Sequence, residues 1–77
     1  MIKVALIGYG KMGKAIDGVI EKEYARKMEV IHRIDENSIH LLEKETLSKA
    51  DVAIEFSTPH TAIDNIYKCF DANVPVV

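Results

Sequence analysis

The glycine-rich turn near the amino terminus constrains this chain more than any other feature. Residues 2–7 read I-K-V-A-L-I, and Gly8, Gly10 and Gly13 then follow at the spacing G-x-G-x-x-G. In a strand–turn–helix unit, the first glycine permits a tight turn, the second lets a pyrophosphate approach the backbone, and the third lets the helix lie close to the sheet. The phosphate would then face the free N–H groups and the positive dipole end of the helix. The motif therefore predicts a dinucleotide site, the alternative being a purely structural glycine loop.

An acidic residue stands at the distance expected for a ribose-binding carboxylate. Asp35 lies 22 positions after Gly13, directly behind a second predicted strand at residues 29–34. A carboxylate there can accept hydrogen bonds from both ribose hydroxyls and repels a 2′-phosphate, which favours NADH over NADPH. Arg33, on the same face of an extended strand, leaves some tolerance of that phosphate. The alternative for Asp35 is a solvated aspartate in a turn.

The remaining elements follow from hydrophobic periodicity and from helix start and stop signals. Strands are predicted at 2–7, 29–34, 52–56 and 74–77, and helices from about 10 to 27 and from 59 to about 72. Thr58 and Pro59 form a helix start, and Asn73 can take the left-handed position after the helix. Residues 36–50 predict only a reduced or irregular crossover.

This order predicts an α/β fold: a partial Rossmann-like parallel sheet of about four strands with helices on both faces. We expect the strand order 3-2-1-4, in which residues 74–77 form an unpaired edge that promotes self-association. In the first helix we expect Ala15, Ile16, Val19 and Ile20 to form an inward stripe, with Asp17 facing water. The apolar residues of the second helix repeat with the helical period of 3.6, and they are Ala62, Ile63, Ile66, Tyr67 and Phe70.

Length and composition bound the class of protein. At 77 residues the chain is one small domain, residues 1–77, and its net charge of −2 gives no electrostatic reason to expect nucleic acid or a membrane as a partner. The single cysteine, Cys69, has no internal disulfide partner, which fits a reducing cytoplasm. No apolar run is long enough to span a bilayer, and we expect no signal peptide because the chain begins with a strand.

Few other residues suggest chemistry. Glu55 interrupts the third strand at its carboxyl end, where we expect it to bond loop backbone, and Lys11 could assist phosphate binding. The three histidines have no metal-ligand spacing, so no metal site is expected. No nucleophile–base pair or carboxylate dyad is present, and therefore no catalytic residue is predicted.

The whole chain resembles the dihydrodipicolinate reductases of the lysine and diaminopimelate pathway, and it corresponds to about the first third of such an enzyme. The matching segments are V-A-L-I-G-Y-G-K-M-G-K at 4–14, Asp35, D-V-A-I-E-F-S-T-P at 51–59 and V-P-V-V at 74–77. The commoner family loop, G-x-x-G-R-M-G, is one residue longer. The G-T-T-G segment expected after Val77 and the later H-H-x-x-x-K region are absent, so we expect a chain truncated before its substrate domain.

The resemblance implies a role for each matching residue. The glycine loop would hold the cofactor pyrophosphate, Asp35 the ribose, and Phe56 and Ser57 the nicotinamide side. The loop residues are Gly8, Tyr9, Gly10, Lys11, Met12 and Gly13. The resemblance also implies an oxidoreductase that transfers hydride from NADH or NADPH to a cyclic imine-like dicarboxylate. This substrate would be bound only in the full-length enzyme, which in the family is usually a homotetramer. The isolated 77-residue chain is expected to be inactive.

Three other interpretations stay open from the sequence. The chain could belong to another Rossmann dehydrogenase, such as an aspartate dehydrogenase-like protein, which only further carboxyl-terminal sequence would distinguish. It could be a non-catalytic nucleotide-binding module, with adenine-nucleotide affinity but no chemistry. It could also be a truncated product that binds nothing well.

Overall fold

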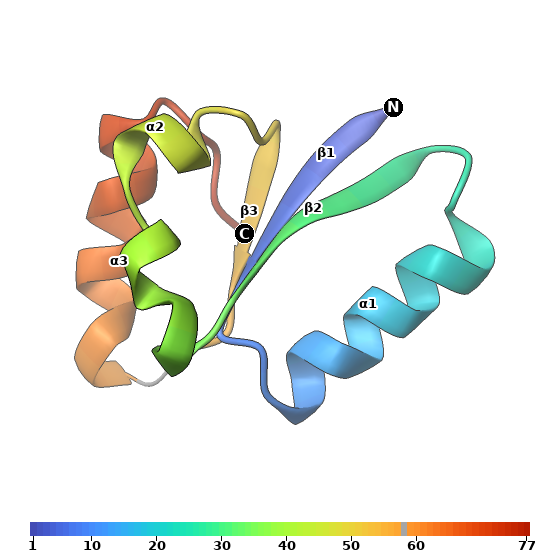
Figure 1. The fold of residues 1–77 in the computed structure, drawn as a ribbon, viewed down its shortest axis with the longest axis horizontal. Coiled ribbons are helices and arrows are strands. Elements are labelled where there is room, and N and C mark those ends of the chain that lie inside the picture. Colours follow the sequence, from blue (N-terminus) through green and yellow to red (C-terminus); the bar gives the residue numbers. More distant parts are fainter. Residues whose placement is uncertain (58) are drawn as a thin grey trace.

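The computed structural model describes residues 1–57 and 59–77, without the side chains of Glu36, Ile39, Leu41, Pro59 and His60. The elements in chain order are β1 (Ile2–Ile7), α1 (Lys11–Glu23), β2 (Met28–Ile34), the 3-10 helix η1 (Glu36–Leu41), α2 (Lys44–Leu47), β3 (Val52–Glu55) and α3 (Pro59–Asp71). Figure 1 shows α1 on one side of the sheet and α2 and α3 on the other. The predicted α/β fold, with a parallel sheet covered on both faces, is therefore confirmed.

The sheet has the order β2-β1-β3, with both strand pairs parallel. The predicted order 3-2-1-4 is wrong, because β3 pairs with β1 and not with β2. The reason is the face on which each crossover runs. The connection from β1 to β2 runs through α1 on one face of the sheet, and the connection from β2 to β3 runs through η1 and α2 on the other face. Right-handed crossovers on opposite faces move in opposite directions along a sheet, so the second connection carries the chain back past β1. The carboxyl end of β1 therefore lies between those of β2 and β3.

The predicted fourth strand is reduced to one bridge. Residues 74–77 lie beside β3, where Val76 forms an isolated parallel bridge with Ala53. The backbone N–H of Ala53 donates to the carbonyl of Pro75 over 2.8 Å, and the N–H of Val77 donates to the carbonyl of Ala53 over 2.9 Å. The described residues thus contain three strands instead of about four, because this segment makes too few ladder contacts to count as a strand.

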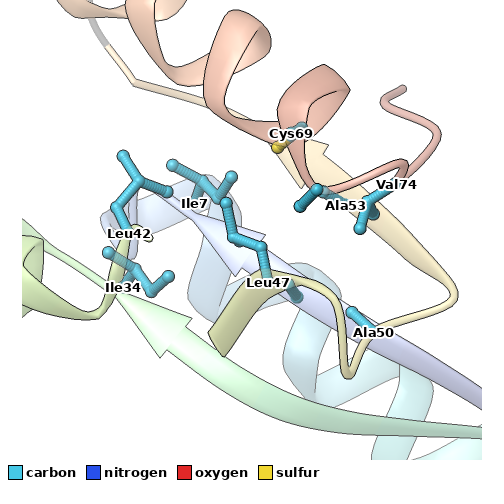
Figure 2. Packing of buried hydrophobic residues seen from close by; sticks show 10 residues of the cluster. Ile7, Ile34, Leu42, Leu47, Ala50, Ala53, Cys69 and Val74 are labelled. Carbon is cyan, nitrogen blue, oxygen red and sulfur yellow. The ribbon is translucent and has the colours of Figure 1, made fainter. Parts of the chain in front are cut away.

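The larger core lies between the sheet and the layer of α2 and α3. Ile7 and Ile34 point from β1 and β2 toward Leu42 and Leu47, and Cys69 faces them from α3 (Figure 2). The irregular crossover predicted for 36–50 is confirmed, since η1 contains a non-helical Ser38 and α2 has only four residues. Short as it is, this crossover buries Leu47 completely. Its role is to cover the sheet rather than to form a long helix.

The inward face of α1 differs from the predicted one. The structure buries Gly13, Asp17 and Ile20, whereas Ala15 and Val19 are exposed. The prediction counted apolar residues, but Asp17 can be buried because Tyr9 and Arg33 donate hydrogen bonds to its carboxylate. A paired carboxylate does not incur the full desolvation penalty that would keep it in water.

The buried face of α3 does not coincide with its apolar repeat. Asn65 and Cys69 of α3 are buried, as is Ala72 just after it, whereas Ile63, Tyr67 and Phe70 are exposed. Small side chains let the helix approach the sheet, and Asn65 finds a polar partner there. Three large apolar side chains consequently form an exposed stripe on the outer surface of the helix.

The helix ends agree in part with the sequence. Asn73 has a φ of 59°, so the predicted left-handed residue after α3 is confirmed. The first helix ends at Glu23, a few residues earlier than predicted, and a turn leads into β2. The predicted cap at Thr58 lies outside the described residues.

Candidate nucleotide-binding site

A cleft of about 510 Å³ opens where the carboxyl ends of the three strands meet. This is the edge at which open α/β sheets bind their ligands, and the volume is within the usual range for a small-molecule site. Its lining combines the glycine turn, the end of β2, the loop after β3 and the start of α3. The residues are Ile7, Gly8, Tyr9, Gly10, Ile34, Asp35, Asn37, Phe56, Ser57, Thr61 and Asn65.

Gly8 makes the turn out of β1 with a φ of 91°, which side chains other than glycine rarely adopt. A Cβ at this position would lie 2.8 Å from the backbone nitrogen of Ser57. The backbone N–H of Gly8 donates to the carbonyl of Ile34 over 2.7 Å, and that of Phe56 donates to the carbonyl of Ile7 over 2.8 Å. The turn is thereby joined to the ends of both neighbouring strands.

Gly10 is the open point of the turn. A Cβ added here would meet nothing within 4 Å. Gly10 also precedes α1 as its N-cap, no side chain caps the helix, and its first turn contains no acidic residue. The first backbone N–H groups of α1 therefore have no intrahelical acceptor, and no carboxylate of that turn opposes an approaching anion.

The other residues of the glycine motif belong to the first turn of α1. Gly13 is buried, and a Cβ on it would come within 2.7 Å of the carbonyl oxygen of Gly8, so it permits close packing of helix against turn. Lys11 and Met12 are exposed in the first turn of α1 and do not line the cleft. Of the six loop residues predicted to contact a cofactor, Gly8, Tyr9 and Gly10 line the cleft.

Asp35 lines the same cleft as the glycine turn. Its Oδ1 accepts hydrogen bonds from the backbone N–H groups of Asn37 and Ser38 and from the Ser38 hydroxyl, over 2.9, 3.0 and 3.0 Å. The Ser38 hydroxyl, followed by the Asn37 N–H, lowers the pKa of Asp35 below its ordinary value. Asp35 is therefore a carboxylate at neutral pH, and these three contacts with Asn37 and Ser38 all use Oδ1. The two alternatives for Asp35, a turn residue and a ligand-binding carboxylate, are compatible in this geometry.

Phe56 and Ser57 line the cleft from the loop after β3. The Ser57 backbone N–H donates to Oε1 of Glu55, so Glu55 bonds loop backbone as expected. The Nδ2 of Asn65 donates to the Ser57 hydroxyl over 3.0 Å. Asn65 was not among the residues predicted from the sequence, although its place four residues before Cys69 puts it on the buried face of α3.

A second polar cluster, also missed, lies beside the cleft. The hydroxyl of Tyr9 donates to Oδ2 of Asp17 over 2.6 Å, and Arg33 reaches the same carboxylate through Nε at 2.5 Å and Nη2 at 3.1 Å. The Arg33 hydrogen bond, with a smaller contribution from Tyr9, lowers the pKa of Asp17. The same contact raises the pKa of Arg33. The sequence signal was available, because Asp17 falls four residues after Gly13 and three before Ile20.

Two of the remaining polar candidates, His32 and Cys69, have structural roles. The Nε2 of His32 donates to the carbonyl of Thr46 over 3.0 Å, which joins β2 to α2. Cys69 is fully buried, as its expected packing role requires, and burial followed by the nearby Glu55 charge raises the pKa of its thiol. The His60 side chain lies outside the described part. Among the described side chains, no group of three or more His, Cys, Asp and Glu is placed to hold a metal ion.

Within the described residues, every helix is too short or too polar to cross a bilayer.

No solved structure matches the chain significantly.

Two comparisons with known proteins agree with each other. The family model described as "Dihydrodipicolinate reductase, N-terminus" matches residues 2–77. A curated protein of Christiangramia forsetii, 4-hydroxy-tetrahydrodipicolinate reductase, is 35% identical over 78 residues, which cover 99% of this chain. The chain spans 30% of the length of that relative. The family resemblance read from the sequence is therefore confirmed: this chain belongs to the family of dihydrodipicolinate reductase amino-terminal regions.

Proposed function

We propose that this chain is the nicotinamide-dinucleotide-binding portion of a 4-hydroxy-tetrahydrodipicolinate reductase. The observation that carries the proposal is the single cleft that Gly8, Gly10, Asp35, Phe56 and Ser57 all line. These residues come from the ends of three strands, so their meeting depends on the fold and not on sequence proximity. Family membership supports the reductase over the aspartate dehydrogenase-like alternative.

The pyrophosphate would lie against Gly10. The open space beside its Cα accommodates a phosphate that any side chain would obstruct, and the uncapped amino terminus of α1 supplies N–H donors and a positive dipole end. The exposed Lys11 can add a positive charge from the same turn. Met12 and Gly13 would contribute backbone rather than side chains.

The adenosine ribose would bind Asp35. Its Oδ1 accepts hydrogen bonds from Asn37 and Ser38, which orients the carboxylate, and Oδ2, which none of these three contacts uses, would accept hydrogen bonds from the ribose hydroxyls. Its charge repels a 2′-phosphate, and Arg33 is engaged by Asp17 instead of being available to compensate. We therefore propose that NADH binds more tightly than NADPH.

Phe56 and Ser57 would face the nicotinamide, with Asn65 fixing the serine hydroxyl. A bound reduced nicotinamide would supply the hydride for reduction of a dihydrodipicolinate-type cyclic imine. We assign no proton donor or substrate-binding group among the described residues, so the 77-residue chain by itself should not turn over substrate. In the full-length enzyme, we propose a cytoplasmic homotetramer that acts in lysine and diaminopimelate synthesis.

The test is a fluorescence titration of the 77-residue chain with NADH, compared between Gly10→Val and Gly18→Val. A Cβ built on either glycine has no atom within 4 Å, so both positions have room for the start of a side chain. Gly18 lies in α1 outside the cleft lining and is the matched control. Gly10→Val should abolish binding while Gly18→Val retains it. Equal titration curves for the wild type and Gly10→Val would remove the proposal's support.

A further inference from the structure

Three side chains from three elements meet behind the glycine turn. Tyr9 comes from the turn itself, Asp17 from the second turn of α1, and Arg33 from β2. Asp17 accepts from both partners, and its exposed fraction is only 7%. We refer to these three residues as the Tyr9 tether. Asp17 and Arg33 are distinct from the contacts proposed for the cofactor, since neither lines the cleft, whereas Tyr9 does.

The tether determines where the Tyr9 ring lies. The ring packs against the start of α1, where a Cβ built on Gly13 would lie 3.5 Å from Tyr9 Cδ1. The Lys14 ammonium lies 6.0 Å from the ring centroid. Tyr9 is nevertheless part of the cleft wall, and the next residue is the unobstructed Gly10. A ring freed from Asp17 could adopt other staggered rotamers, including ones that direct it over Gly10.

The charges of the tether also balance. A lone buried carboxylate behind the phosphate site would oppose an anionic ligand and would be costly to desolvate. The Arg33 guanidinium contacts both carboxylate oxygens and neutralises the charge locally. The Asp17 carboxylate accepts the hydrogen bond from the Tyr9 hydroxyl, and this bond raises the pKa of the phenol above its ordinary value. Tyr9 therefore remains a donor at neutral pH.

We propose that Asp17 is a positioning residue for dinucleotide binding, which acts by holding the Tyr9 side chain away from Gly10. Arg33 supports this role by keeping Asp17 ionised and its charge compensated. The inference rests on the proposed function, because it assumes that the pyrophosphate lies at Gly10. Asp17 does not touch the ligand; it acts through the conformation of the turn.

The experiment measures dissociation constants for NADH, ADP-ribose and adenosine with the 77-residue chain. The test variants are Tyr9→Phe, Asp17→Ala and the double variant, and the controls are Tyr24→Phe and Asp64→Ala at exposed positions. Tyr9→Phe removes only a hydroxyl, so it stays informative even where Asp17→Ala impairs folding. Far-ultraviolet circular dichroism verifies the fold of each variant.

Each test variant should weaken NADH and ADP-ribose binding about threefold to tenfold, the usual effect of losing one hydrogen bond. Adenosine, which lacks the pyrophosphate, should bind unchanged. The double variant should bind no more weakly than Asp17→Ala, because both changes break the same contact. In Asp17→Ala, tyrosinate absorbance should show the pKa of Tyr9 moved down toward its ordinary value.

Two outcomes would overturn the positioning role alone. One is wild-type NADH affinity in folded Tyr9→Phe and Asp17→Ala chains, and the other is an equal loss of affinity for adenosine and ADP-ribose. Failure of the wild-type chain to bind NADH at all would instead overturn the proposed function. The two ideas are therefore tested separately.

Discussion

Arg33 and Asp17 form a two-point ion pair between β2 and α1, with Nε 2.5 Å from Oδ2 and Nη2 3.1 Å from Oδ1. The pair fastens the helix that begins at the glycine turn to the strand that ends at Asp35. It also gives Arg33 a partner inside the fold, whereas the sequence left it open as a group for a 2′-phosphate. One contact thus bears on both stability and cofactor preference.

The first prediction concerns the pH dependence of stability. Pairing lowers the folded-state pKa of Asp17, so its contribution is complete above the unfolded pKa of about 3.9 and is lost as pH falls through the lower folded-state pKa. The free energy of unfolding, measured with urea, should fall in both chains between about pH 7 and about pH 2. The loss should be about 0.5 kcal/mol smaller in Asp17→Asn than in the wild type, because the variant has no ion pair to lose. The effect is modest because the Arg33 side chain is 46% exposed.

Asp64→Asn, at an exposed position on α3, is the control for this measurement and should follow the wild type. Asp35 also has a lowered pKa, so part of the acid loss should persist in Asp17→Asn. Identical pH profiles for Asp17→Asn and the wild type would contradict a stabilising pair.

The second prediction separates two glycines of the motif by stability. Gly8→Ala should lower the free energy of unfolding by about 2 kcal/mol, because the left-handed backbone and the Ser57 nitrogen leave no room for a methyl group. Gly10→Ala should lower it by less than about 1 kcal/mol, since its Cβ would point into open space and the remaining cost is that of a poorer N-cap residue. Chemical denaturation measures both values. Equal destabilisation by the two substitutions would show that the turn differs from the one described.

The third prediction concerns the discrimination between NADH and NADPH. Asp35→Asn retains an oxygen that can accept from the Asn37 and Ser38 N–H groups, so the turn after β2 should persist. Removing the charge relieves about 1 kcal/mol of repulsion toward a 2′-phosphate, so the NADPH dissociation constant should fall about fivefold relative to that of NADH. Competitive titration with both cofactors measures the ratio, with Asp64→Asn as the control. An unchanged ratio would place the ribose elsewhere.

The fourth prediction concerns self-association of the 77-residue chain. On α3, Ile63, Tyr67 and Phe70 are 64%, 63% and 58% exposed. The rings of Tyr67 and Phe70 pack edge to face, with their centroids 6.4 Å apart. Replacing Ile63 and Phe70 by Lys should lower light scattering, with less than about 0.5 kcal/mol lost in stability. Tyr24→Lys, at an exposed position near α1, is the control.

The sequence pointed to a different surface for self-association, the edge formed by residues 74–77. Unchanged scattering after the two lysine substitutions, together with lower scattering after Val76→Lys, would assign the association to that edge. A stable monomer in the wild type at high concentration would contradict both.

The sequence predicted the local elements well and the helix faces poorly. The glycine spacing, the apolar strands and Asn73 act through backbone conformation within a few residues, so their consequences are local and were confirmed in the structure. The buried face predicted for α1 was wrong, and the apolar repeat of α3 does not mark its buried face, because hydrophobic periodicity assigns every Asp and Asn to water. Asp17 and Asn65 are buried because partners distant in sequence, Arg33 and Ser57, satisfy their hydrogen bonds.

By itself, the sequence determined the parallel α/β class, the turn that Gly8 requires, and the family to which the chain belongs. Only the tertiary structure decided that β3 lies beside β1, that Asp35 lines one cleft with the glycine turn, and that Arg33 pairs with Asp17. The physical reason is range. Backbone preferences and apolar repeats operate over a few residues, whereas crossovers and buried polar pairs depend on segments that only folding brings together.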